Sequence, residues 1–122
     1  MATIALTNLP LNGGKQECRI LTWGTLTTTN SVGEAFPAAA YPDKSVQVEG
    51  TFGAAATVVI QGTNEEIPTN WHTLVDPQGN ALSFTAARLE AVLENTRWVR
   101  PALASGGDGS TSIDVIMMIV AR

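Results

Sequence analysis

Apolar and polar residues alternate through most of the second half of the chain, which is the pattern of β-strands with one buried face. In residues 45–52, Val46 and Val48 share one face of the predicted strand. Gln47 and Glu49 share the other face, because successive side chains of a strand point to opposite sides. The same pattern predicts strands over residues 54–61, 70–75, 81–84, 97–103 and 111–122. We expect residues 54–61 to pair with the strand that precedes them, and residues 105–110 to connect the last two strands as a hairpin.

The last predicted strand, residues 111–122, is apolar on both faces except at Asp114. A strand of this kind is either central and covered on both sides, or has one face that meets a partner molecule. We favour burial within the fold.

Residues 85–93 are the one segment whose composition favours a helix. Its alanines and leucines are good helix formers, and Thr85 can cap the first turn. Leu89, Val92 and Leu93 fall at the spacing i, i+3 and i+4, which gives one apolar stripe. The sequence therefore predicts a single short helix here, covering one end of the fold.

The N-terminal third is less regular. Residues 3–9 alternate weakly, residues 18–29 predict a long strand around Trp23, and residues 30–43 have no clear period. Long loops in compact domains are usually functional or mobile. The whole pattern predicts an all-β fold, an antiparallel β-sandwich with one short helix. The 122 residues suit a single domain, with residues 1–14 as a candidate N-terminal arm.

Composition narrows the classes of partner. The net charge is -4 and the seven basic residues are scattered, so we expect no binding to nucleic acid. No segment approaches the roughly 20 apolar residues of a membrane helix, and the first residues do not form a signal peptide. We therefore expect no membrane partner and synthesis in the cytoplasm. Charged residues are only 15% of the chain and hydrophobic residues are 44%, which suits docking against other protein.

Reactive side chains are few. His72 is the only histidine, which excludes a metal site with two histidines and leaves a pairing with Cys18 as the one nucleophile option. These two residues lie on separate predicted strands. Glu65 and Glu66 are neighbours on a loop, where an acid and base pair rarely converges on a substrate. We expect no enzyme activity, no catalytic residue, no cofactor and no metal.

Tryptophans raise one alternative, because carbohydrate-binding modules present aromatic rings on which sugars stack. Trp23 and Trp71 are the candidates for such stacking. The interpretation we favour is that Trp71 and Trp98 belong to the core or rim of the sandwich, where each can bury a large area.

Three segments of the chain resemble a strand-loop-strand pattern shared by two groups of proteins. They are VVIQGTN at residues 58–64, NWHTL at residues 70–74 and RWVRP at residues 97–101. One group is the discoidin-like carbohydrate- and lipid-binding sandwich, from which this chain departs by lacking a cysteine pair and by being shorter. The other is a set of small virion proteins of tailed phages, which the DPQGNALSFTAA block at residues 76–87 also resembles.

The second resemblance implies a capsid decoration, or cement, protein of jelly-roll type on the exterior of a phage head. It implies the major capsid protein as partner and self-association as a homo-dimer or homo-trimer. We expect the partner interface on the apolar residues of the two irregular segments, Thr3, Ile4, Leu6, Leu9, Val32, Phe36 and Tyr41. Two alternatives stay open: a carbohydrate- or receptor-binding module of a phage tail, and a tail or head-completion component.

Overall fold

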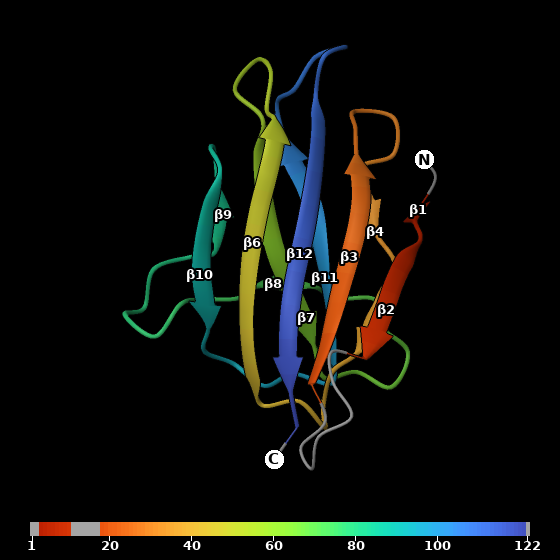
Figure 1. Cartoon of the computed structure of the whole chain (residues 1–122), viewed down its shortest axis with the longest axis vertical. Coiled ribbons are helices and arrows are strands. Elements are labelled where there is room, and N and C mark those ends of the chain that lie inside the picture. The colour runs from red at the N-terminus through yellow and green to blue at the C-terminus, as the bar shows by residue number, and fades with distance from the viewer. Residues whose placement is uncertain (1–2, 11–17, 122) are drawn as a thin grey trace.

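Two β-sheets make up the fold in the computed structural model, which describes residues 3–10 and 18–121 (Figure 1). Sheet A contains β1 (Thr3–Ile4), β4 (Val32–Gly33), β5 (Phe36–Pro37), β7 (Thr57–Thr63), β8 (His72–Thr73), β9 (Ser83–Phe84) and β11 (Trp98–Ser105). Sheet B has the order β10 (Arg88–Val92), β6 (Asp43–Thr51), β12 (Ser112–Val120), β3 (Cys18–Leu26) and β2 (Leu6–Pro10). Every strand pair is antiparallel except β1 with β4, which is parallel. The predicted all-β class is confirmed.

The hydrophobic core lies between the two sheets. Along β12 the inward residues Ile113, Val115, Met117 and Ile119 are fully buried, while the residues between them remain at least partly exposed. The opposite layer contributes Val58, Ile60, Phe84 and Val99, among others. Each fully buried side chain of this size contributes about 1.5–3 kcal/mol relative to exposure. The alternation of apolar and polar residues in the sequence therefore arises because each strand buries one side in the core between the two sheets.

Two of the expected strand pairings were wrong. Residues 57–63 form β7 in sheet A, where they pair with β11, β8 and β9, and not with β6. The segment 105–110 also crosses between the sheets, because β11 belongs to sheet A and β12 to sheet B. Alternation shows which side of a strand is buried. It does not show which sheet the strand belongs to, because both sheets bury their inner side against the same core.

The helix predicted over residues 85–93 was also wrong: residues 88–92 form strand β10, and no helix occurs in the part of the chain that the structure describes. An isolated helix of nine residues is marginal in water. As a strand, the segment gains five registered pairs with β6, from Arg88 opposite Val48 to Val92 opposite Lys44. This pairing covers an edge of β6 that would otherwise present unpaired backbone groups.

Candidate interaction surfaces

The two segments predicted to contact a partner lie together on one side of the molecule. Thr3 is in register with Val32, and Ile4 with Gly33, where β1 pairs with β4. Glu34 strengthens the junction, because its backbone N–H donates to the Ile4 carbonyl (2.8 Å) and its Oε1 accepts from the Leu6 N–H (3.0 Å). Residues 3–10 pass from sheet A to sheet B, since β2 pairs with β3. We call this side, made by β1, β2 and β4, the N-terminal side.

The seven predicted interface residues differ in exposure. Thr3 and Leu9 are exposed, whereas Ile4, Leu6 and Tyr41 are partly buried and pack against the core. Val32 is also partly exposed. Phe36 is a correction: its ring is buried in the core, with the Tyr41 ring 5.9 Å away, so it is not available to a partner. Residues 11–14 of the predicted arm lie outside the described residues, and residues 3–10 pair as strands.

Trp23 is likewise unavailable for sugar stacking, which corrects that part of the alternative. Its side chain has no exposed surface, and its Nε1–H donates to the Glu34 carbonyl at 2.8 Å. Trp71 is partly exposed, and one side of its ring is occupied by the Arg100 guanidinium, 4.1 Å from the ring centroid. Of the two predicted stacking residues, only Trp71 can meet a ligand.

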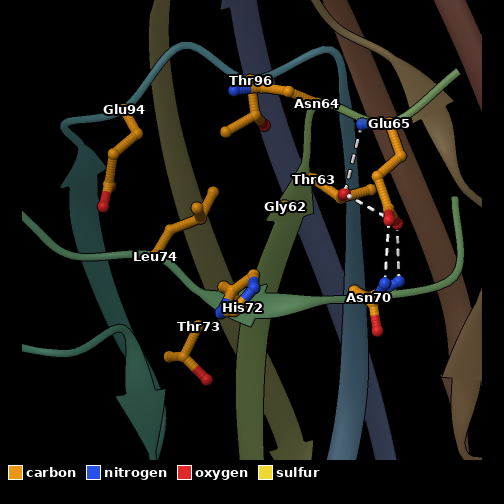
Figure 2. Close-up of a pocket in the computed structure, with 10 residues that line it drawn as sticks. All are labelled: Gly62, Thr63, Asn64, Glu65, Asn70, His72, Thr73, Leu74, Glu94 and Thr96. Carbon is orange, nitrogen blue, oxygen red and sulfur yellow. Dashed lines mark hydrogen bonds between the residues drawn. The ribbon is translucent and has the colours of Figure 1, made fainter.

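A polar hollow of about 740 Å³ lies at the end of β7 (Figure 2). Its lining consists of Gly62, Thr63, Asn64, Glu65, Asn70, His72, Thr73, Leu74, Glu94 and Thr96. In Figure 2, Glu65 and Glu94 lie on opposite sides of the hollow, with His72 between them. Most of the lining can donate or accept hydrogen bonds but carries no charge.

Glu65 organises the loop between β7 and β8. Its Oε1 accepts hydrogen bonds from the backbone N–H groups of Asn70 (2.6 Å) and Thr69 (2.9 Å), and its Oε2 accepts from the Asn70 side-chain amide (2.8 Å). The backbone carbonyl of Glu65 accepts from Trp98 Nε1 at 3.0 Å. These donors, the Asn70 backbone N–H first, lower the pKa of Glu65 from its ordinary 4.5 to about 2. The carboxylate therefore stays ionised and holds the loop closed.

The hollow does not assemble a free acid and base pair. Glu65 is committed to the loop, and Glu94 Oε1 accepts from the Val75 backbone N–H at 2.9 Å. His72 is exposed on β8 of sheet A, while Cys18 is on β3 of sheet B, so the structure does not bring this pair together. The hollow offers hydrogen-bonding groups together with the carboxylates of Glu65 and Glu94.

The outer side of sheet B carries several exposed apolar side chains that no described segment covers (Figure 1). In Figure 1 this sheet is the layer nearest the viewer, and no described segment lies in front of it. The strand registers place Leu9, Ile20, Met118, Ser45 and Ala91 in one row across all five strands. A second row contains Thr7, Thr22, Ile116, Gln47 and Leu89. We call these two rows, with Cys18 and Val120 beside them, the outer face.

Charge is confined to the ends of the outer face. Glu49 and Asp114 are opposite each other at one end, and Asp43 is opposite Val120 at the other. A hollow of about 190 Å³, lined by Asp43, Lys44, Ser45, Met118 and Val120, lies next to Met118. The outer face was missed as a site, although the doubly apolar sequence of residues 111–122 was its signal. The structure shows β12 as a central strand that is covered on one side only.

The described residues contain no group of three or more His, Cys, Asp or Glu side chains placed to hold a metal ion. No helix among them has the length and apolarity needed to cross a membrane.

Fold and surfaces together define a small all-β protein made of two sheets. No protein-family model and no curated protein matches the chain. Among solved structures, the fold is similar to the SPBc2 prophage-derived protein YomS, with a TM-score of 0.61 and 12% sequence identity. That likeness covers 90% of this chain and 100% of the YomS chain. At this identity the comparison shows a shared fold.

Proposed function

We propose that this chain is a structural protein of a tailed-phage particle: a decoration, or cement, protein of jelly-roll type on the outer surface of the head. The observation that carries the proposal is the pairing of β1 with β4. It brings two irregular segments, remote in sequence, to one side of the sandwich, where uncharged and apolar residues are partly exposed. The fold shared with a prophage-derived protein supports the same class.

The mechanism in this proposal is adhesion. The N-terminal side contacts neighbouring major capsid subunits and gains free energy by removing apolar area from water. Each contact is weak, but the repeated sites of an icosahedral shell raise the effective concentration and multiply weak contacts into stable attachment. No chemical step is needed, so the protein acts as a non-enzymatic bridge.

Copy number in purified particles of the encoding phage tests this proposal. Quantitative mass spectrometry should find hundreds of copies per particle for a head decoration protein. A few to dozens of copies would instead indicate a tail or head-completion component. Absence from the particle would overturn the structural role altogether.

Point variants test the contact side without removing the paired strands. Ala5→Asp places a charge on an exposed position between β1 and β2, and we expect particle occupancy to fall at least about tenfold, since an unpaired charge resists desolvation. Ala104→Asp, at an exposed position of β11, is the matched control and should keep full occupancy. Equal occupancy for both variants would remove the N-terminal side as the contact.

A carbohydrate- or receptor-binding role is the second candidate, and it rests on Trp71, which is partly exposed. Asn70 and His72, the neighbours of Trp71, both line the polar hollow. A glycan array with the intact protein and with Trp71→Ala tests this role. Binding that is lost in the variant would support it, and no binding by the intact protein would exclude it for the sugars on the array.

A further inference from the structure

We propose that the outer face of sheet B is a self-association surface, and that its occupant is the outer face of a second copy of this chain. The inference does not depend on the phage role, because it is argued from the strands of sheet B, of which only the edge strand β2 also belongs to the N-terminal side. It starts from exposure: Leu89 is 63% exposed, Leu9 60% and Met118 39%, all on one sheet face. Large contiguous apolar patches are uncommon on proteins that remain monomeric.

The size of the outer face matches a modest dimer. Its five strands are five to nine residues long. At about 3.3 Å per residue and about 4.8 Å between strands, the face covers about 600 Å². Complete burial of both sheet sides, charged ends included, would remove at most about 1,200 Å² from water, which is the lower end of the range for specific interfaces. A second copy therefore supplies enough area for reversible association.

The distribution of charged residues on the outer face also suits a second copy of the chain as the partner. The two central rows carry no charged residue, and the acids Asp43, Glu49 and Asp114 lie at the ends. Two sheets that pack face to face cross at about 30°, so their corners diverge and remain in water. The acids then form a polar rim around an apolar centre, which is the usual anatomy of an interface.

The shape of the outer face near Met118 allows it to fit against a second copy of itself. Met118 helps to line the hollow of about 190 Å³, together with Ser45, Val120 and the charged residues Asp43 and Lys44. In a two-fold dimer the same patch faces itself, so Met118 of each copy can fill the hollow of the other. Methionine is flexible and polarisable, which suits it to such a contact.

Sedimentation of the purified full chain tests the inference. We expect monomer near about 1 µM and dimer near about 200 µM, because an interface of this area supports only moderate affinity. Met118→Asp should weaken association at least about 100-fold, since each dimer then buries two unpaired carboxylates. Ile67→Asp is the matched control: Ile67 is 75% exposed on the loop that connects β7 and β8 of sheet A, and its replacement should leave association unchanged.

Salt and a second variant complete the test. Added salt should strengthen association, because it screens the rim carboxylates of the two copies from each other. Leu89→Asp on β10 should weaken association as Met118→Asp does, and circular dichroism should show both variants folded. A wild-type chain that remains monomeric at about 200 µM, or variants that associate as strongly as wild type, would overturn the assignment. Association that weakens with salt would also overturn it, because the charged residues that the described strands place at the ends of this face, Asp43, Glu49 and Asp114, are all acids.

Discussion

Single residues decide how tightly the loops and layers of this fold are held. Trp23 and Trp98 show that an aromatic residue in an alternating strand is mostly a packing residue, since each ring nitrogen donates to a backbone carbonyl within the molecule. Lys44 is the exception to the alternation that sequence reasoning did not foresee. It points inward, donates to the Tyr41 carbonyl at 2.7 Å, and burial lowers its pKa.

Glu65 gives the molecule a defined acid sensitivity. Its folded pKa of about 2 lies below its ordinary 4.5, so its contribution to stability is present above 4.5 and is lost as pH falls towards 2. Glu65→Gln should therefore lower the melting temperature at pH 6, and the deficit should shrink on acidification through this window. Thermal unfolding followed from pH 6 to about pH 2 measures it.

Glu66→Gln is the control for this pH dependence. Glu66 is the next residue and is exposed, and its replacement makes the same change in net charge. Its melting temperature should follow the wild type across the whole pH range. If the melting temperature of Glu65→Gln differed from that of the wild type by the same amount at every pH, the result would contradict the role assigned to the Glu65 carboxylate.

Gly33 is fixed by close packing between the two sheets. A Cβ built at this position would lie 2.6 Å from Trp23 Cδ1 and 2.6 Å from Pro101 Cδ. Gly33→Ala should lower the free energy of unfolding by about 1–3 kcal/mol, because neither ring can move without disturbing the core. Gly109→Ala faces open space and should stay within about 0.5 kcal/mol of wild type in the same denaturant titration. Equal stability of both variants would show that the layers are packed less tightly here.

At the scale of elements, the sequence predicted which segments are strands better than it predicted their partners. The strands around Val46, Trp23 and Met117 were placed correctly, because a period of two follows from a shared core. The pairing of β7 with β11 could not be predicted, because crossing between sheets leaves no mark on local alternation. Strand β10 was mistaken for a helix because propensities of a few tenths of a kcal/mol yield to pairing with β6.

Valine substitutions distinguish the strand from the helix at β10. Ala91 is exposed on β10, so Ala91→Val should raise the free energy of unfolding by about a few tenths of a kcal/mol, because β-branched residues favour strands. Ala86 lies just before the strand and should show no such gain when replaced by Val. Destabilisation by both substitutions, measured by denaturant titration, would instead indicate a helix over the whole segment.

At the scale of the whole molecule, the segments of the candidate contact site could be predicted from the sequence, but how these segments are arranged in space could not. The two irregular segments were predicted as contact regions from their lack of period, whereas their meeting at β1 and β4 depends on a long-range parallel pair. The outer face depends on the register of five strands, which no local pattern encodes. Both proposals therefore depend on surfaces that several strands build together.

Methionine oxidation in the assembled state tests this central claim most directly. Met117 and Met118 are neighbours on β12, but Met117 is fully buried and Met118 is 39% exposed. Hydrogen peroxide should oxidise Met118 quickly in dilute monomer and at least about tenfold more slowly in concentrated dimer, while Met117 stays slow in both states. Oxidation of Met118 at one unchanged rate in dilute and concentrated protein would contradict the account, because the outer face would then be uncovered in both.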